Sequence, residues 1–337
     1  MRATRPMLPF AAFFFLTLPG LAQNVAIDWV TVGDPGNTAD TTGFGAVADS
    51  YQIGKYDVTI QQYTDFLNAV AATDPYSLYN TNMATNLNIA GIQQNGSSGE
   101  YTYSVIGSGG NKPITYVSWF DAARFANWMQ NGQGSGSTET GAYTLVGGQT
   151  SGTAPGKNPG AQFFIPTENQ WYKAAYYDPT KDGTGGYWRY ATQSDTAPGN
   201  VIGSGTNQAN YKINNVYSVT QSSDYSLSQN YLTDVGAFTN SVSAYGTFDQ
   251  SGNIYQWNDL DGTASSDRGL RGGDWDMFDA DLFASTFRST FDASGEFNYL
   301  GFRLASPVAV PEPSMWVMGL AGIACAGWGT YRRHKKA

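Results

Sequence analysis

The sequence predicts a loop-rich α+β domain with few helices and short strands, and three observations support that prediction. Three segments combine a helix-capping residue with apolar residues at helical spacing. Long tracts of Gly, Ser, Asn and Thr separate these segments. After Tyr177 short β-like pieces alternate with turn residues as far as Arg303.

The first elements are expected to be two strands and a helix. β-branched and aromatic residues gather at 25–32 and 48–53, which predicts the strands. The helix should begin after Thr59, because Thr is a good N-cap and an apolar stripe follows it. The stripe consists of Tyr63, Phe66, Leu67 and Val70.

Two further helices are predicted from capping patterns. Residues 118–121 (Ser-Trp-Phe-Asp) form a capping-box pattern, and residues 167–170 (Thr-Glu-Asn-Gln) form a second one. The stripe after the first consists of Ala122, Phe125, Ala126 and Met129. The second pattern precedes Trp171, Ala174 and Ala175.

Polar tracts and tryptophans complete the expected architecture. The tracts at 74–111 and 131–160 are predicted to be surface loops, because they hold too little apolar surface to form core. Seven Trp residues lie between residues 23 and 306. We expect most of them in the core, because Trp buries a large apolar area.

The composition excludes several kinds of chemistry. Among 337 residues there is one Cys, Cys325, and one His, His334, and both lie near the C-terminus. A disulfide framework, a multi-thiolate zinc site, a Ser-His-Asp triad and a cysteine nucleophile are therefore not expected in the domain. Carboxylate pairs of the glycosidase type are available, but no spacing selects one pair.

The N-terminus has the pattern of a secretory signal, predicted for residues 1–22. Arg2 and Arg5 precede a short apolar centre, and residues 20–22 (Gly-Leu-Ala) supply the small residues before a cleavage point at Gln23. An N-terminal membrane anchor is disfavoured, because the apolar run is too short to span a bilayer.

The C-terminus, residues 310–337, combines three features of a sorting signal. Pro311, Glu312 and Pro313 precede an apolar run at 315–329, and a basic cluster follows at 331–336. This order resembles a PEP-CTERM signal, which implies an exosortase-type enzyme as partner and a short transmembrane segment with a cytoplasmic basic tail. A plain C-terminal anchor is the alternative. Both place the domain at 23–306 outside the inner membrane. The sorting signal further implies a protein that is first anchored and then lies at the cell surface or is released.

Removing the two end segments makes the domain more acidic. The full chain has 18 Lys and Arg, 27 Asp and Glu, and a formal net charge of −9. Six basic residues and one acidic residue lie in the end segments, which leaves 12 and 26 and a net charge of −14. No nucleic-acid partner is expected, because phosphate backbones are bound by Lys and Arg.

Seven short motifs lie in an order that is similar to a known family. Residues 113–119 read Pro-Ile-Thr-Tyr-Val-Ser-Trp and residues 271–275 read Arg-Gly-Gly-Asp-Trp. The other motifs lie at 54–59, 165–171, 235–238, 245–257 and 301–303. Together they resemble the formylglycine-generating-enzyme, or sulfatase-modifying-factor, family from about residue 50 to residue 305. The resemblance implies a C-type-lectin-like fold that is rich in loops and usually binds calcium.

The family's oxidase activity is not expected here. The resemblance implies two copper-binding cysteines downstream of Arg271-Gly272-Gly273, and the matching positions are Met277 and Leu282. Neither supplies a thiolate, and copper(I) needs soft sulfur ligands, so copper is not expected. Relatives with a three-histidine iron site are excluded as well, because the domain contains no His. We predict no catalytic residue and lean against an enzyme.

Calcium is the cofactor that the resemblance implies. The corresponding family loop offers one side-chain oxygen, two carbonyls and a carboxylate, in keeping with the oxygen ligands that calcium prefers. The matching residues are Asp249, Gly252, Ile254 and Gln256. Gln256 replaces the usual Glu, which removes one charge, while Asp249 restores a carboxylate. A second family site begins near Asn210 and Tyr211. The alternative is a turn and a buried strand without metal.

Two groups of charged residues have competing interpretations. One group is an acidic run: Asp274, Asp276, Asp279 and Asp281. It could form a second cation site or an acidic binding rim, or it could be a solvated loop. The solvated loop is favoured, because runs of charged residues usually are solvated. The arginines Arg271, Arg288 and Arg303 are expected to pair with internal carboxylates or carbonyls, because Arg tolerates partial burial best.

The sequence therefore predicts an exported, surface-sorted binding or structural module with extracellular polysaccharide or matrix as its partner. The missing cysteines, the export signals and an aromatic, loop-rich surface suited to stacking on sugars support it. The alternative is a formylglycine-generating-type or other enzyme that reuses the family pocket without the cysteine pair. A deep polar pocket behind residues 271–275 would favour the enzyme, and a shallow aromatic surface would favour binding.

Overall fold

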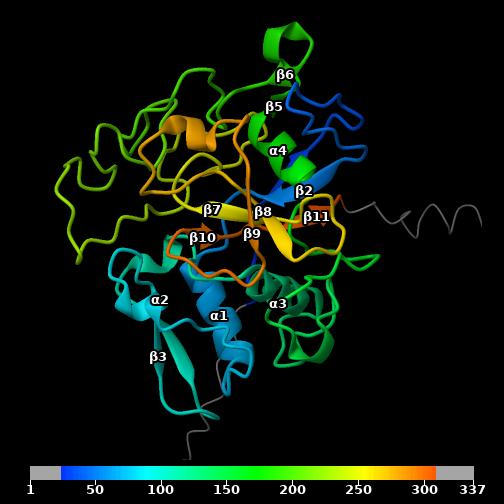
Figure 1. Ribbon diagram of the computed structural model, residues 1–337, viewed down its shortest axis with the longest axis vertical. Coiled ribbons are helices and arrows are strands. Elements are labelled where there is room, and N and C mark those ends of the chain that lie inside the picture. The colour runs from blue at the N-terminus through cyan, green and yellow to red at the C-terminus, as the bar shows by residue number, and fades with distance from the viewer. Residues whose placement is uncertain (1–23, 309–337) are drawn as a thin grey trace, which may run out of the picture.

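A computed structural model of the chain describes residues 24–308. The predicted secretory signal at 1–22 and the sorting signal with Pro311, Glu312 and Pro313 lie outside the described residues. A four-stranded sheet lies between α1 and α3 on one side and α4 with the long loops on the other (Figure 1).

The three predicted helices form where their caps indicated. α1 (Ile60–Val70), α3 (Trp119–Gln130) and α4 (Glu168–Tyr176) begin directly after Thr59, Ser118 and Thr167. The side chain of each cap accepts a hydrogen bond from the backbone N–H three residues later, and the backbone N–H of the cap donates to the side chain of that residue, which completes a capping box. Local sequence alone therefore positions all three helices.

Aromatic side chains hold α1 and α3 together. Phe66 of α1 meets Phe125 of α3 edge to face, with ring centroids 5.4 Å apart. Phe125 makes the same contact with Phe302, which precedes the last strand. Five of the seven Trp residues are buried, as expected: Trp119, Trp128, Trp171, Trp257 and Trp275. Edge-to-face aromatic pairs of this kind favour one packing arrangement over others.

Two sheets form the centre of the domain. One has the order β10 (Leu300–Gly301), β7 (Tyr255–Asn258), β8 (Asp267–Arg271) and β9 (Ser289–Asp292), with only the β10–β7 pair parallel. The other joins β1 (Trp29–Val32), β2 (Tyr51–Gly54) and β11 (Ala305–Pro307), all antiparallel. The second sheet brings the beginning and the end of the domain side by side. The strands predicted at 25–32 and 48–53 form in their second halves.

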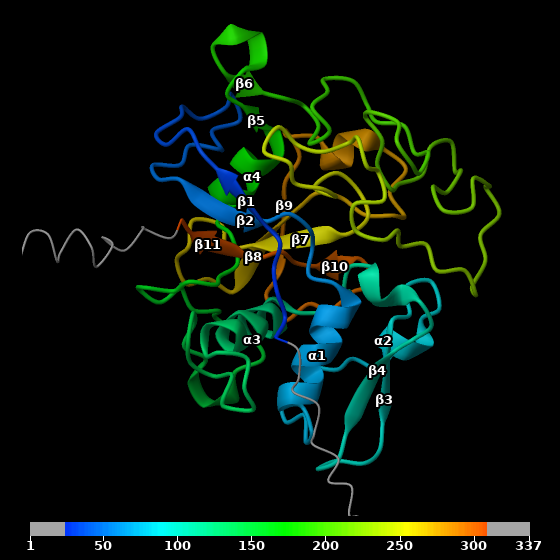
Figure 2. The ribbon, with the colours of Figure 1, turned by 180° about the vertical axis from the view of Figure 1, so that it is seen from behind.

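The surface-loop prediction for 74–111 was wrong in part. This tract contains the helix α2 (Asn82–Thr85) and the short 3-10 helix η1 (Gly109–Asn111). It also contains the hairpin formed by β3 (Ile92–Asn95) and β4 (Thr102–Val105). The hairpin extends beside α1 (Figure 2). Single apolar residues of the tract are buried in the main core, namely Leu78, Tyr79, Met83 and Ile92.

The second polar tract and the rest of the chain are mostly irregular. The tract at 131–160 contains only the turn η2 (Val146–Gly148), but Tyr143 and Leu145 are buried in the core, so it too is more than a surface loop. After α4 come the pair β5 (Tyr177–Asp178) and β6 (Gly186–Tyr187) and the turns η3 (Lys181–Gly183) and η4 (Ala280–Phe283). Within residues 24–308, no helix has the length and apolar character needed to cross a bilayer.

Candidate functional site

The motif at 271–275 turns the chain sharply at the end of β8. Gly272 and Gly273 have φ angles of +101° and +69°, a region that residues with a Cβ rarely adopt. A Cβ on Gly273 would also lie 3.0 Å from the Phe283 side chain. The two glycines thus allow the turn that carries Trp275 back into the protein, where 3% of it is exposed.

The three predicted arginines form ion pairs with internal carboxylates. Arg271 and Arg288 both bind Glu168 at the start of α4, with N–O distances of 2.8 Å, and of these two arginines only Arg271 is buried. Hydrogen bonding to Glu168 raises the pKa of Arg288. Arg303 pairs with Asp57 at 2.9 Å, and both side chains are buried. The Arg271–Glu168 pair joins the end of β8 to the start of α4.

Trp275 is the base of a stack of aromatic rings, which we call the aromatic stack (Tyr217, Tyr225, Tyr231 and Trp275). The Trp275 and Tyr231 rings are 5.2 Å apart and nearly parallel, at 4°. Tyr225 continues the stack at 5.8 Å and 8°, and Tyr217 lies 4.4 Å from Tyr231. Tyr225 is 52% exposed, so the stack runs from the interior to the surface.

Asn88 fixes the exposed end of the aromatic stack. Its Oδ1 accepts a hydrogen bond from the Tyr225 hydroxyl at 2.5 Å, and its Nδ2 donates to the Ser226 carbonyl at 2.8 Å. The exposed side chains Leu87 and Leu227 belong to the same two loops. The result is a preorganised aromatic surface with apolar neighbours, and preorganisation lowers the entropic cost of binding.

The charged residues beside the stack differ in burial. Asp276, Asp279 and Asp281 are exposed, which fits a solvated loop. Asp274 departs from that interpretation: it is 3% exposed and accepts a hydrogen bond from the Asp276 N–H at 2.8 Å. Burial raises the pKa of Asp274 to about 7. Lys212 forms an ion pair with Asp276 at 2.9 Å.

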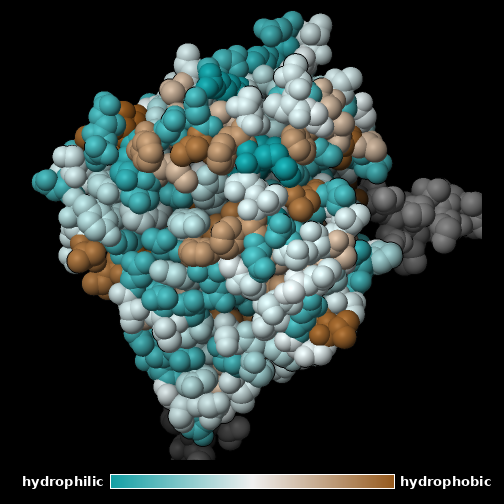
Figure 3. Space-filling model, viewed as in Figure 1, coloured by the Kyte–Doolittle hydropathy of each residue, from teal (hydrophilic) through white to brown (hydrophobic). Residues whose placement is uncertain are grey.

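Residues 271–275 line none of the cavities described within residues 24–308. A cavity of about 360 Å³ lies beside the motif and is lined by Glu168, which pairs with Arg271, and by Arg288. Figure 3 shows apolar side chains among hydrophilic ones on the face of the molecule seen in Figure 1. None of these cavities is lined by the rings of the aromatic stack, so its exposed end suits contact with an extended ligand.

The two positions where the resemblance implies cysteines hold apolar side chains. Met277 is partly buried and packs against the main core, and its backbone carbonyl accepts a hydrogen bond from the Lys212 N–H at 2.7 Å. Leu282 lies in η4 and is half-buried. Neither side chain offers a thiolate to a copper ion.

The four residues of the first predicted calcium set lie on the turn into β7: Asp249, Gly252, Ile254 and Gln256. The Gln256 side chain is fully engaged. Its Oε1 accepts hydrogen bonds from Trp171 Nε1 and Arg303 Nε, each at 2.7 Å, and its Nε2 donates to the Asp249 carbonyl at 2.6 Å. An amide oxygen with two donors and a guanidinium beside it does not fit a calcium ligand, which needs a free lone pair.

Asp249 supplies the carboxylate of this set. It is buried, and its Oδ2 accepts a hydrogen bond from the Gly236 N–H at 2.7 Å. Burial raises the pKa of Asp249 to about 6, and the Gly236 bond and Arg303 oppose that rise. Within residues 24–308 no three His, Cys, Asp or Glu side chains are grouped to hold a metal ion. Calcium binding at this turn stays a prediction.

The second predicted set lies against the first. Asn210 forms a parallel bridge with Gly252, and its Nδ2 donates to the Tyr231 carbonyl and to Asn253 Oδ1, both at 2.9 Å. The Tyr211 hydroxyl donates to the Pro198 carbonyl. The structure thus brings the two predicted calcium sets together and joins them to the aromatic stack through Tyr231.

The aromatic stack is the part of the site that sequence reasoning did not identify. Its three tyrosines come from a Ser- and Asn-rich tract that carries no periodic pattern. The available signal is the gathering of Tyr217, Tyr225 and Tyr231 in an otherwise polar segment, because aromatic residues in such loops often serve in contact surfaces.

Comparisons with known proteins agree with this architecture. CarF has 21% sequence identity to this chain and a TM-score of 0.52, covering 84% of this chain and 99% of CarF. Treponema denticola variable protein 1 has 19% identity and a TM-score of 0.51, covering 85% and 97%. PvdO from Pseudomonas aeruginosa has 17% identity and a TM-score of 0.41, covering 84% and 92%. No curated protein matches the chain significantly.

A family model gives the assignment. Residues 36–308 match the model of the sulfatase-modifying factor enzyme 1-like domain. The match covers most of the chain, and the few helices, short strands and long loops agree with the fold expected of that family. The chain therefore belongs to the sulfatase-modifying factor enzyme 1-like family.

Proposed function

We propose that this domain is a non-oxidase binding module, carried by an exported and surface-sorted protein, that attaches to extracellular polysaccharide or matrix. The observation that carries the proposal is the aromatic stack, which presents the 52% exposed Tyr225 ring at the surface, stacked on Tyr231. Aromatic rings on such surfaces supply apolar contact area with little loss of conformational entropy. Sugar rings offer the complementary apolar faces.

Two features of the sequence support a role other than oxidation. Met277 and Leu282 stand where the family resemblance implies copper-binding cysteines, and the one Cys of the chain, Cys325, lies in the C-terminal segment. A copper(I) dithiolate site needs two soft sulfur ligands. The proposed module therefore works through oxygen donors and aromatic rings.

The location of the module is part of the proposal. The N-terminal pattern at 1–22 and the C-terminal pattern at 310–337 support export, transient anchoring and processing by an exosortase-type enzyme. A domain net charge of −14 supports a partner without strong negative charge, because like charges repel.

An enzyme that reuses this surface is the second candidate. The buried Asp274 favours it, because a carboxyl with a pKa of about 7 is suited to proton transfer near neutral pH. The position of Asp274 weighs against it, because Asp274 lines none of the cavities described within residues 24–308 and small substrates are usually enclosed.

A binding screen with an oxidation control tests the proposal. The purified processed protein is applied to an array of polysaccharides and assayed in parallel, after copper loading, for oxidation of a cysteine peptide. We expect glycan binding that Tyr225→Ala weakens and Tyr225→Phe retains, because Phe keeps the ring and loses only the bond to Asn88. Turnover of the peptide, or equal glycan binding by Tyr225→Ala, would overturn the proposal.

A further inference from the structure

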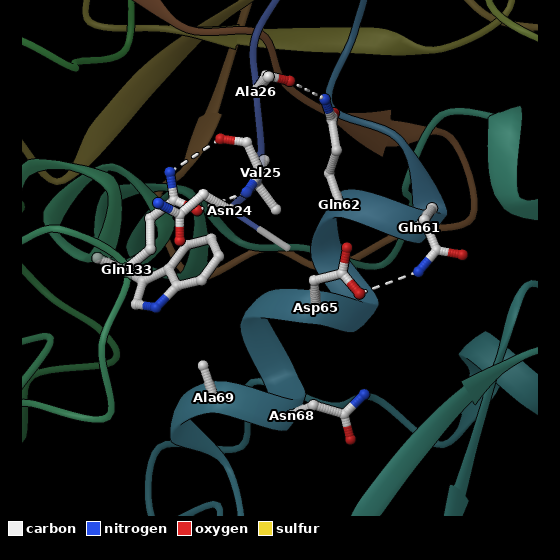
Figure 4. A pocket seen from close by; sticks show the side chains of 10 residues that line it. Asn24, Val25, Ala26, Gln61, Gln62, Asp65, Asn68, Ala69 and Gln133 are labelled. Atoms are coloured by element: carbon white, nitrogen blue, oxygen red, sulfur yellow. Dashed lines mark hydrogen bonds between the residues drawn. The ribbon is translucent and has the colours of Figure 1, made fainter. Parts of the chain in front are cut away.

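A cavity lies away from the aromatic stack. It has a volume of about 500 Å³ and opens between α1, the end of α3 and residues 24–26 (Figure 4). Pockets that enclose small ligands commonly have 300–1,000 Å³. The cavity is therefore large enough for one or two sugar rings.

The chemistry of the lining is that of a neutral polar site. Its polar side chains are five amides and one carboxylate, and the indole of Trp128 is its one aromatic group: Asn24, Gln61, Gln62, Asp65, Asn68, Gln133 and Trp128. No Lys or Arg lines the cavity. Amides both donate and accept hydrogen bonds, as sugar hydroxyls do, and an indole provides an apolar surface.

The walls of the cavity are fixed by internal contacts. Gln133 holds Val25 through two bonds, accepting from its N–H at 2.6 Å and donating to its carbonyl at 2.8 Å. Gln62 donates to the Ala26 carbonyl at 2.8 Å. Trp128 Nε1 donates to the Gly134 carbonyl at 3.1 Å, which sets the orientation of the indole. The site is thus largely preformed.

The wall of the cavity formed by α1 offers two acceptor oxygens to a ligand, one on Gln61 and one on Asp65. Gln61 Nε2 donates to Asp65 Oδ1 at 3.0 Å, one turn apart on α1 (Figure 4). Neither Gln61 Oε1 nor Asp65 Oδ2 accepts a hydrogen bond from another side chain or backbone group in residues 24–308. Partial burial raises the pKa of Asp65. These two oxygens suit the hydroxyl donors of a ligand.

We propose that this cavity binds a sugar residue of a neutral polysaccharide. It would be a second contact point in addition to the aromatic stack. The inference rests on the proposed polysaccharide-binding function and names the charge class of its ligand. Acidic polysaccharides would meet Asp65 and the domain's net charge of −14, and no Lys or Arg side chain in the lining offsets them. Two contact points on one chain increase the strength of binding to a repeating polymer.

Calorimetric titration of the processed protein tests the inference. The probes are cellotetraose, mannotetraose and galactotetraose, with tetragalacturonate as the acidic probe. We expect a neutral probe to bind and the double variant Gln61→Ala/Asp65→Ala to weaken it about tenfold, as expected for two lost hydrogen bonds. Both positions lie on a helix surface where Ala is well tolerated. Gln93→Ala removes an exposed amide on β3, outside the cavity, and should leave binding unchanged.

The outcomes separate this inference from the proposed function. If Tyr225→Ala weakens binding and the double cavity variant does not, the cavity is not a sugar site but the binding function stands. If the wild-type protein binds no glycan at all, both fail. Tighter binding of tetragalacturonate than of every neutral probe, or a cavity that takes only amines or peptides, overturns the assignment of ligand class.

Discussion

At the scale of single residues, Asp274 shows how a turn changes the protonation of a side chain. Burial raises its pKa to about 7 from the ordinary 3.8, and its Oδ1 accepts the Asp276 N–H. The folded state therefore holds this proton more tightly than the unfolded chain does. The stabilising effect is complete below pH 3.8 and is lost as the pH rises towards 7.

The variant Asp274→Asn should remove this pH dependence. Asn keeps an oxygen acceptor for Asp276 and has no proton to lose. Between pH 4 and pH 7 the free energy of unfolding of the wild type should fall, relative to the variant, by about 1.4 kcal/mol per pH unit. Urea unfolding at pH 4 and pH 8 measures the difference. Parallel pH profiles for the two proteins would show that Asp274 is ionised in the folded state.

Arg303 provides a second prediction at this scale, because its guanidinium joins three segments. It binds Asp57, Gln256 and the Phe248 carbonyl with no exposed surface. Arg303→Met leaves Asp57 buried and unpaired, and such a loss costs about 3 kcal/mol or more. Thermal and urea unfolding of the variant and the wild type measure this loss in the free energy of unfolding.

An exposed ion pair serves as the control for Arg303. Arg189 and Asp281 are paired at 2.5 Å, but their side chains are 46% and 64% exposed. Arg189→Met should therefore change the free energy of unfolding by less than about 1 kcal/mol. Equal effects of Arg303→Met and Arg189→Met would contradict the structural role of the buried pair.

At the scale of elements, helices were predictable and the hairpin was not. α1, α3 and α4 follow from caps and apolar stripes that lie within a few residues of each other. The hairpin β3–β4 depends on Asn68 of α1, which accepts from the Tyr103 N–H and donates to the Tyr103 carbonyl, each at 2.9 Å. A helix side chain thus replaces a strand partner, and no local pattern encodes that contact.

The candidate site likewise has one part that the sequence predicted and one part that it did not. The arginine pairs were expected because Arg271 and Arg303 belong to recognisable motifs. The aromatic stack was not, because Tyr231 meets Trp275 across more than forty residues of mostly irregular chain. Contacts between loops depend on the whole fold, and the sequence of either loop alone does not specify them.

The turn that leads into β7 gives a prediction about calcium. Gln256 occupies the position where the family resemblance implies a carboxylate, and its oxygen is engaged by Trp171 and Arg303. Gln256→Glu places a second carboxylate beside Asp249 and should increase the rise in melting temperature caused by calcium. Melting curves with calcium and with EDTA measure it. Equal calcium shifts in the variant and the wild type would show that residue 256 does not contact the ion.

At the scale of the whole molecule, the distribution of charge predicts the isoelectric point of the protein that the proposed processing would leave. Six of the 18 basic residues and one acidic residue, Glu312, lie in the two end segments, so removal of both segments changes the net charge from −9 to −14. The processed protein should therefore focus below the isoelectric point of about 4.5 expected for the full chain. Its intact mass should correspond to a chain that begins at Gln23 and lacks residues 310–337.

Cys325 makes the C-terminal part of this prediction easy to follow, because it is the only cysteine in the chain. A maleimide label applied under denaturing conditions should mark the precursor in the membrane fraction and leave the surface protein unlabelled. Replacing Pro311, Glu312 and Pro313 with Ala should keep the label and the basic tail on the protein in the membrane, since the sorting motif is lost while the apolar run remains. Wild-type surface protein that still carries the label would instead indicate a plain C-terminal anchor.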